Sequence, residues 1–368
     1  MKIVHVVHSF YPDKGGIEIH AYSLLKEMHG TERLVYTTKS DPGQSGYELV
    51  DMIKVRRFSS FAFPGFSSVR FSPGMMAALL LDRAPDLYCS HGYGSPMPLM
   101  AAIAALIKRK PYIFTLHGYP KLAGLGGVFL WLYRNFAARI FLAIAKRVIV
   151  VSNASMAEIE GQVGPKKIVY VPNGADIQKF AGVPADFTQS DTLTYVGRIE
   201  KYKGIETLIE AFALLKSRYP KLRLAIYGKD EDYRQNLELL AKNLGVELSI
   251  SQMEYGDMAN AYAGSRAILM ASLYEGFSLV WLEAIASGRA MFTTPVGDAE
   301  FFLKDILGAD SEYFIFREAN ELVDKLSYFL NNQEKFKPIV ARAREAVKQR
   351  YTWKNVAERT KKIYEECQ

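Results

Sequence analysis

The sequence has little cysteine and no long membrane-spanning run. Only Cys89 and Cys367 occur in 368 residues, which are too few for a disulfide framework and form no metal-binding spacing. No purely apolar run reaches the roughly 18 to 20 residues that a membrane-spanning helix needs. The opening MKIVHVVHSFYP holds a short apolar run interrupted by His5 and His8, which does not fit a signal peptide. The sequence therefore predicts a cytoplasmic protein with reduced thiols.

Carboxylates are also missing from a long stretch of the first half. Residues 87–157 contain eight lysines and arginines but no aspartate or glutamate, and residues 1–180 carry a net charge of +9 against −2 for the remainder. Such a field attracts nucleic acid, anionic lipid head groups or a phosphorylated substrate. No helix-turn-helix, zinc-finger or ribonucleoprotein signature accompanies the charge, so nucleic acid is not an expected partner.

Short β-branched runs alternate with amphipathic stretches along the whole chain, a pattern typical of parallel strands joined by helices. At roughly 100 to 200 residues per domain, the length favours two domains. We expect an α/β protein with two Rossmann-like, doubly wound domains over residues 1–180 and 181–350. The predicted strands are 2–7, 33–37, 53–57, 87–90, 112–115 and 147–151, then 192–196, 223–227, 247–250, 267–270, 290–293 and 313–316.

In doubly wound sheets, ligands bind beyond the carboxyl ends of the strands. Two such domains are therefore expected to face each other across a binding cleft, with the site in the loops that follow the strands.

The segment 272–288, SLYEGFSLVWLEAIASG, follows one predicted strand and opens a helix near Ser278. The free backbone N–H groups of such a helix start can bind an anion. Glu275 lies in the turn and Glu283 lies inside the helix. Taken alone, the two glutamates would more often be a loop carboxylate and a solvated helix residue.

The segment 195–204, YVGRIEKYKG, opens the second domain. A strand runs into Gly197, and one tight loop then carries Arg198 and Lys203 before a helix that begins near Ile205. A planar guanidinium and a compact ammonium that converge on one point suit a diphosphate. Without further context, two such cations are usually solvent-exposed, and Lys201 is expected outside the pair.

Two loops in the first domain are also candidates. The loop over 10–18, FYPDKGGIE, reaches a helix at Gly15 and Gly16, which either let the backbone approach a ligand closely or form a flexible turn. No G-x-G-x-x-G follows a predicted strand, so a dinucleotide-dependent oxidoreductase is disfavoured. His117 and Gly118 end another predicted strand, although an isolated histidine is more often a packed residue than a catalyst.

Together, EGFSLVWLEAIASG, the 195–204 loop, GGIE and TLHGY resemble retaining glycosyltransferases of family 4, which have the GT-B fold. The resemblance covers nearly the whole chain. It departs from the family at Ser278 and Val280, where glycine and proline are usual. The serine keeps its N–H for a phosphate but leaves the backbone less free, so a narrower sugar pocket is expected.

The resemblance implies a role for each candidate residue. Glu275 would contact donor-sugar hydroxyls, Glu283 the ribose, and His117 the region of the anomeric carbon. Arg198 and Lys203 would clamp the diphosphate, which the amides near Phe277, Ser278 and Leu279 would face. The other donor-binding candidates are Gly15, Gly16, Gly118, Asn173, Gly197, Gly228 and Gly276. Residues 351–368 resemble the family's C-terminal helix that crosses back to the first domain.

The implied reaction is transfer of a sugar, with retention of configuration, from a nucleotide-diphosphate donor to a glycan or lipid-linked acceptor in cell-surface polysaccharide or glycolipid synthesis. No cofactor or metal is expected, because the cations and helix-start amides would supply the charge stabilisation. Two alternatives stay open: a GT-B sugar-nucleotide epimerase and a non-catalytic module that binds membranes peripherally.

Aromatic residues interleave with cations over residues 121–147 and, more loosely, over residues 56–70. Such patches can attach reversibly to an anionic bilayer. The competing interpretation is a helix whose apolar face packs on the sheet. We expect peripheral attachment to the inner face of the cell membrane through the first domain.

Overall fold

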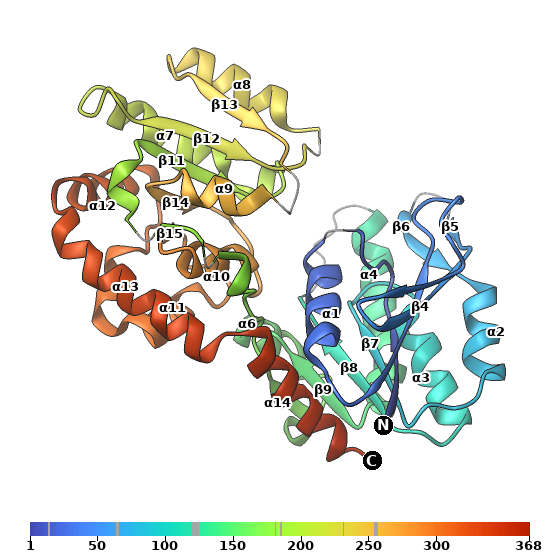
Figure 1. The fold of residues 1–368 in the computed structure, drawn as a ribbon. Helices are drawn as coiled ribbons and strands as arrows, with labels where there is room; N and C mark the ends of the chain where they lie inside the picture. The colour runs from blue at the N-terminus through green and yellow to red at the C-terminus, as the bar shows by residue number, and fades with distance from the viewer. Residues whose placement is uncertain are drawn as a thin grey trace. The chain divides into compact units, whose positions relative to one another are not determined.

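The computed structural model describes residues 1–13, 15–63, 66–118, 125–180, 182–184, 186–230, 232–253 and 257–368 (Figure 1). The chain divides into two compact units, one formed by residues 1–174 with 353–368 and the other by residues 175–352. The expected boundary at residues 180 and 181 lies slightly later in the chain. The C-terminal helix is part of the first unit.

The first unit holds an eight-stranded sheet with the order β10–β9–β8–β7–β1–β2–β4–β3, parallel except for β3. The strands are β1 (Lys2–Val6), β2 (Glu32–Thr38), β3 (Tyr47–Val50), β4 (Ile53–Phe58), β7 (Leu87–His91), β8 (Tyr112–Leu116), β9 (Arg147–Val150) and β10 (Ile168–Tyr170), with a separate hairpin of β5 (Phe61–Phe63) and β6 (Phe66–Phe71). All six strands predicted here are confirmed. The four that were missed are the edge strands β3 and β10, which have no fully buried residue, and the two strands of the hairpin.

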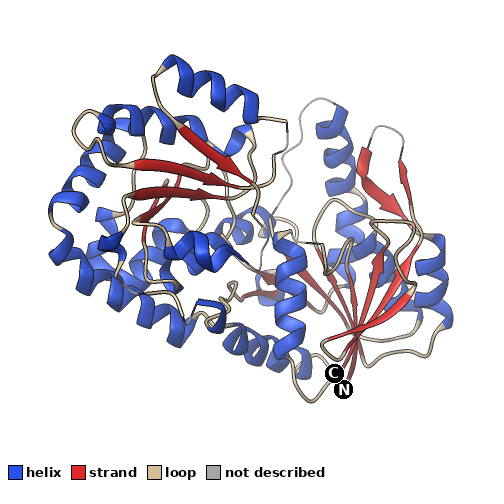
Figure 2. Cartoon of the chain, turned by 45° about the horizontal axis from the view of Figure 1, so that its top comes forward, coloured by secondary structure: helices blue, strands red, loops and turns tan. Residues whose placement is uncertain are grey.

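Helices lie on both sides of this sheet (Figure 2), so the central strands β1, β7 and β8 are buried on both faces; β8 is mostly apolar, whereas β1 and β7 also bury His5, Ser90 and His91. The helices are α1 (Gly16–Glu27), α2 (Pro73–Leu81), α3 (Met97–Ile107), α4 (Leu125–Asn135), α5 (Ala137–Ile144), α6 (Asn153–Ile159) and α14 (Trp353–Glu365). α14 is tied to the unit by side chains that donate to backbone carbonyls, such as Lys146 Nζ to Cys367 at 2.6 Å and Arg359 to Tyr170 at 2.9 Å.

The second unit holds a five-stranded parallel sheet with the order β13–β12–β11–β14–β15. Its strands are β11 (Thr192–Val196), β12 (Arg223–Tyr227), β13 (Leu248–Ser251), β14 (Ala267–Met270) and β15 (Ala290–Thr293). Its α-helices are α7 (Ile205–Lys216), α8 (Arg234–Asn243), α9 (Met258–Ala263), α10 (Leu279–Ala286), α11 (Ala299–Leu307), α12 (Ala319–Asn331) and α13 (Gln333–Arg350). Each unit is thus a Rossmann-like α/β layer structure.

The predicted strand over residues 313–316 is wrong. Residues Gly308–Tyr313 form a 3-10 helix, and Ile315 makes only an isolated bridge to Thr293. The apolar run is buried by packing instead, since the ring of Phe314 lies 5.5 Å from that of Phe292 and 5.8 Å from that of Phe336. Burial against β15 and α13 produced the same apolar pattern that a strand would have.

The two predicted aromatic and basic patches, over residues 121–147 and 56–70, differ in how their described side chains are exposed and paired. Along α4 and α5, five apolar side chains at helical spacing are between 45% and 64% exposed: Val128, Trp131, Leu132, Phe136 and Ile140. In the second patch, Arg57 is buried and donates to Glu48, so it is not part of an exposed surface, while Arg56 pairs with Asp82 and Phe61 is exposed. Residues 121–124 and the side chains of Phe63 and Phe66 lie outside the described part of the chain. Among the described helices, none is long and apolar enough to cross a membrane.

Candidate active site

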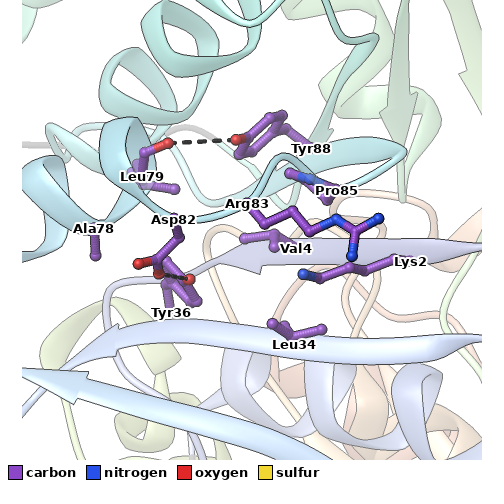
Figure 3. Close-up of a pocket in the computed structure, with 10 residues that line it drawn as sticks. All are labelled: Lys2, Val4, Leu34, Tyr36, Ala78, Leu79, Asp82, Arg83, Pro85 and Tyr88. Atoms are coloured by element: carbon purple, nitrogen blue, oxygen red, sulfur yellow. Dashed lines mark hydrogen bonds between the residues drawn. The ribbon is translucent and has the colours of Figure 1, made fainter.

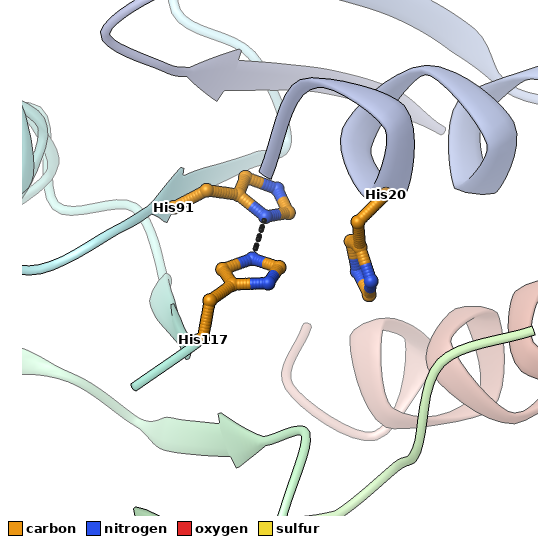
Figure 4. Close-up of side chains that lie close together, drawn as sticks. All are labelled: His20, His91 and His117. Carbon is orange, nitrogen blue, oxygen red and sulfur yellow. Dashed lines mark hydrogen bonds between the residues drawn. The ribbon is translucent and has the colours of Figure 1, made fainter. Parts of the chain in front are cut away.

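Histidines from adjacent strands meet near the carboxyl end of the first unit's sheet. His91 is the last residue of β7, and His117 follows β8. Nδ1 of His91 lies 3.2 Å from Nε2 of His117 (Figure 4), and Nε2 of His91 lies 2.9 Å from Nδ1 of His5 in β1. The three imidazoles form one hydrogen-bonded chain because β8, β7 and β1 are neighbours in the sheet.

A fourth histidine, His20, reaches this chain from α1 (Figure 4). Its ring meets that of His117 edge to face, with centroids 4.5 Å apart, and Trp353 packs against it from α14 at 5.2 Å. His20 Nδ1 lies 2.8 Å from Oδ1 of Asn173. Two predicted site residues, His117 and Asn173, therefore belong to one cluster. Sequence reasoning missed His5, His20 and His91, although two of them lie in predicted strands or directly after one.

Burial keeps these imidazoles neutral. Removal from water lowers the pKa of His5 to about 3 and that of His20 to about 4. The same desolvation holds the pKa of His91 and of His117 well below the usual value. Neutral imidazoles can bond to sugar hydroxyls or ligate a metal. Among the described residues, the nitrogens of His20, His91 and His117 form the one group that could hold an ion, all within 4.8 Å of one another.

The glycine pair lies at the start of α1. Gly15 is the residue before the helix and Gly16 is its first residue, as predicted. A side chain at Gly15 would collide with the carboxylate of Glu18, which accepts a hydrogen bond from Ser9, whereas a Cβ at Gly16 would meet open space. The contact is with the end of a flexible side chain, so the Glu18 carboxylate would have to move to admit a side chain at Gly15. Gly118, next to His117, has φ of +130°, a conformation that favours glycine.

In the second unit, Lys203 and Glu275 form an ion pair. Nζ of Lys203 lies 2.6 Å from Oε1 of Glu275, which also accepts a hydrogen bond from Ser272 Oγ at 2.8 Å. Only 12% of the lysine side chain and 13% of the glutamate side chain are exposed. The pair joins the two strongest sequence motifs. The simple interpretation of Glu275 as a free loop carboxylate is wrong.

Arg198 lies on the same loop as Lys203 and is 57% exposed. Its Nη1 donates to Glu200 at 2.5 Å, and its Nη2 donates to the Tyr202 hydroxyl at 2.6 Å. The Tyr202 ring has Arg198 at 5.9 Å and Lys203 at 5.0 Å from its centroid. The two predicted cations are therefore arranged around one aromatic ring, a role for Tyr202 that sequence reasoning missed.

Close backbone contacts shape this edge of the sheet. Gly197 has φ of +147°, and its N–H donates to the carbonyl of Tyr227 at 3.0 Å. A side chain at Gly228 would collide with the carbonyl of Gly197. Glycine is needed at position 228 because the loops after β11 and β12 touch through their main chains, and at position 197 because of its positive φ.

The helix α10 begins where the sequence predicts. Ser278 precedes it, and its Oγ accepts a hydrogen bond from the N–H of Val280 at 3.3 Å, while Leu279 is the first helical residue. The Phe277 ring is buried against Trp281 with centroids 5.9 Å apart, and the carbonyl of Gly276 accepts from the N–H of Asp298 at 3.1 Å. The turn is thereby held rigidly ahead of the helix.

Glu283 lies on the buried side of α10. The residue is only 7% exposed. Oε2 of its side chain accepts a hydrogen bond from the Tyr262 hydroxyl of α9 at 2.8 Å. A carboxylate in this position is expensive to bury and is positioned by a dedicated donor. The interpretation of Glu283 as a solvated helix residue is therefore wrong.

No metal is expected, but the sequence contains one acidic triplet whose carboxylates are of a kind that can bind a metal. Asp230, Glu231 and Asp232 form an Asp-x-Asp sequence, of which Asp230 and Asp232 follow β12 and Glu231 lies outside the described residues. The Oδ1 of Asp230 accepts the backbone N–H groups of Tyr233 and Arg234, both at 3.0 Å, at the start of α8. Asp230 thus serves as a helix-start acceptor in this structure.

A small pocket lies at the opposite edge of the first sheet (Figure 3). It is lined by residues that include Lys2, at the start of β1, and Asp82. The Asp82 carboxylate already accepts hydrogen bonds from Tyr36 and Arg56. Because this pocket is at the amino ends of the strands and its acid is paired, it is not a candidate for the substrate site.

The sequence matches two protein families that together cover most of the chain. Residues 14–179 match the family described as Glycosyltransferase Family 4, and residues 176–346 match Glycosyl transferases group 1. The chain is 25% identical over 372 residues to the phosphatidylinositol N-acetylglucosaminyltransferase gpi3 subunit of Schizosaccharomyces pombe, covering 97% of this chain and 78% of that protein. It is 26% identical over 303 residues to a GDP-mannose:cellobiosyl-diphosphopolyprenol alpha-mannosyltransferase of Xanthomonas oryzae, covering 78% and 77%.

Solved structures give the same fold. Anabaena HepE in complex with UDP and glucose superposes with a TM-score of 0.80 at 20% identity, over 100% of both chains. Sucrose-phosphate synthase from Thermosynechococcus elongatus gives a TM-score of 0.74 at 19% identity, over 100% of this chain and 99% of that one. With the two parallel sheets and the family matches, these findings confirm the prediction: the chain belongs to the family 4 glycosyltransferases and has their GT-B fold.

Proposed function

We propose that this glycosyltransferase moves a sugar, with retention of configuration, from a nucleotide-diphosphate donor to a lipid-linked acceptor. The observation that carries the proposal is the Lys203–Glu275 ion pair, because it holds a cation and a carboxylate together ahead of the helix α10. One relative is named for transfer to phosphatidylinositol and another for transfer to a diphosphopolyprenol. These acceptors support a role in glycolipid or cell-surface polysaccharide synthesis.

The leaving group of such a reaction is a nucleoside diphosphate, whose charge grows as the bond to the sugar breaks. An ammonium has three N–H donors, and Lys203 uses one on Glu275, so others are available to phosphate oxygens. Arg198, more than half exposed, supplies a planar guanidinium on the same loop. The backbone N–H groups at the start of α10, around Phe277, Ser278 and Leu279, add a fixed anion-binding dipole.

Glu275 and Glu283 are proposed to bind different parts of the donor. Glu275 is held by Lys203 and Ser272 and would accept hydrogen bonds from sugar hydroxyls. Glu283, oriented by Tyr262, would bind the ribose. Gly197, Gly228 and Gly276 shape the backbone around them.

In the first unit, His117 is proposed to contact the donor sugar, with Asn173, Gly118 and the Gly15–Gly16 turn as further binding groups. Because burial keeps His117 neutral, it can hydrogen bond to a hydroxyl without adding charge. By analogy with the family that the sequence resembles, the departing diphosphate, and not an enzyme base, is proposed to take the acceptor's proton.

The exposed stripe of α4 and α5 supports docking on an anionic membrane from the cytoplasmic side. Trp131 and Phe136 are 60% and 64% exposed, and Arg134 and Arg139 are exposed on the same two helices. Aromatic side chains at the lipid interface and cations near anionic head groups act together in such attachment. A lipid-linked acceptor would then be met at the surface where it resides.

Calorimetry with UDP and GDP tests the donor part of the proposal directly. Saturable binding of one of them is expected, in the presence or absence of EDTA. Absence of binding to either nucleotide would contradict the proposed donor class. Analysis of the sugar products then separates transfer from epimerisation of the donor.

A further inference from the structure

The chain of imidazoles behind His117 has a defined beginning and end. His5 and His91 are 0% and 1% exposed, whereas His117 is partly exposed. The chain therefore runs from the core of the first unit to the carboxyl edge of its sheet. Each of the two links uses one nitrogen of each ring, at 2.9 Å and 3.2 Å.

All three rings are neutral, so each has one N–H and one lone pair. Two successive hydrogen bonds across three such rings must then run in the same direction. In one direction, His5 Nδ1–H donates to His91 Nε2, and His91 Nδ1–H donates to His117 Nε2. In the other direction, His117 Nε2–H donates inward and His5 is left with its proton on Nε2.

The surroundings of His5, at the buried end of the imidazole chain, favour one of the two directions of the hydrogen bonds. Nε2 of His5 is buried and has no hydrogen-bond partner among the residues that the structure describes. A buried N–H without an acceptor is among the rarest groups in folded proteins, so the inward direction is disfavoured. In the outward direction, Nε2 of His5 carries only a lone pair.

We propose that His5 and His91 are positioning residues that fix His117 as the tautomer protonated on Nδ1. His117 then presents a permanent N–H donor from its exposed side, while its Nε2 is occupied by the N–H of His91. His20 packs against the ring edge to face and limits its rotation. His117 is in this way a hydrogen-bond donor that cannot accept a proton from the acceptor hydroxyl.

The consequence of this inference for catalysis rests on the proposed function. The N–H donor at His117 can bind a hydroxyl oxygen of the donor sugar. No proton is transferred at His117 in this scheme. In the proposed reaction, the acceptor's proton goes to the departing diphosphate. The positioning itself is a property of the protein without substrate.

The direct test is 15N NMR of the full-length protein labelled on its histidines, with His117→Gln to assign the signal. We expect an N–H at Nδ1 and a bare Nε2 at His117 near pH 7. A proton on Nε2, or a charged ring, would overturn the proposal. Because no substrate is present, this result is independent of the proposed reaction.

Two variants of His91 separate positioning from packing. His91→Asn places an amide N–H close to the position of Nδ1, whereas His91→Gln extends to the position of Nε2 and leaves His117 Nε2 without its donor. With folding confirmed by thermal melts, the Asn variant should keep the His117 tautomer and most of kcat. The Gln variant should show mixed tautomers and a fall in kcat of about tenfold, as for one lost hydrogen bond to the reacting complex.

His29→Gln is the matched control, since His29 is exposed and outside the chain, and it should change neither readout. Equal effects of His91→Asn and His91→Gln on tautomer and kcat would contradict the positioning role. Metal analysis of the purified protein completes the test. One equivalent of bound metal on His20, His91 and His117 would replace the hydrogen bond between His91 and His117 and overturn the proposal.

Discussion

Lys203 and Glu275 lie 72 residues apart in the sequence, yet Nζ of one is 2.6 Å from Oε1 of the other. The lysine comes from the loop after β11 and the glutamate from the turn after β14, two strands that pair directly in the sheet. The fold therefore delivers a cation and a carboxylate to the same point. The proposed chemistry of the second unit starts from this pair.

Loss of either clamp cation should slow transfer strongly. Lys203→Ala and Arg198→Ala are each expected to lower kcat by about 100-fold or more, comparable to the loss of an oxyanion-stabilising donor at about 2.7–4 kcal/mol. Steady-state kinetics with circular dichroism checks this. Lys201→Ala, an exposed lysine of the same loop, is the control and should stay within a few-fold of wild type. Activity near wild type in both test variants would remove the clamp assignment.

Substitutions of Glu283 and Glu275 should have different effects on the affinity for the nucleotide. Glu283→Gln is expected to weaken binding of the free nucleoside diphosphate by about tenfold, since a ribose contact persists in that ligand. Glu275→Gln should leave nucleotide affinity nearly unchanged and reduce sugar transfer. Tyr262→Phe, which removes only the hydroxyl that orients Glu283, should weaken nucleotide binding less than Glu283→Gln does. Equal nucleotide affinities for wild type and Glu283→Gln would show that the roles are assigned wrongly.

Acid should destabilise the first unit through its buried histidines. The folded-state pKa of His5 is lowered to about 3 and that of His20 to about 4, below the value of about 6.5 for an exposed imidazole. Between those limits the unfolded chain binds more protons, so stability falls as pH drops below about 6.5, by up to about 1.4 kcal/mol per pH unit for each such histidine. Urea unfolding at pH 7, 6 and 5 measures this. His20→Gln should lower the dependence of the unfolding free energy on pH by about one bound proton. An unchanged pH dependence in this variant would contradict the lowered pKa of His20.

The α4–α5 stripe should bind anionic vesicles. Co-sedimentation with phosphatidylglycerol-containing vesicles is expected at low salt and should weaken at high salt, with little binding to pure phosphatidylcholine. Trp131→Ser combined with Phe136→Ser should abolish the preference. Leu239→Ser, which removes an equally exposed side chain of α8 in the second unit, is the control. No preference of the wild type for anionic vesicles at low salt would end the docking proposal.

Sequence patterns predicted the fold well because both sheets are buried on two faces, so most strands appear as continuous apolar runs. The exception, residues 313–316, has the same apolar character but is buried by rings such as Phe292 and Phe336. The sequence could not predict the His5–His91–His117 chain, because it depends on strand order. Residues 5, 91 and 117 are distant along the chain and become neighbours only when β1, β7 and β8 pair.

Transfer of one sugar with retained configuration is the central claim, and the anomeric configuration of the product tests it most directly. The purified protein would be incubated with UDP-N-acetylglucosamine, UDP-glucose and GDP-mannose in turn, together with vesicles that contain phosphatidylinositol or polyprenyl diphosphate glycans. NMR of the isolated glycolipid should show an α-linked sugar from one α-configured donor, formed without added metal. A β-linked product, or an epimerised nucleotide sugar without transfer, would contradict the account.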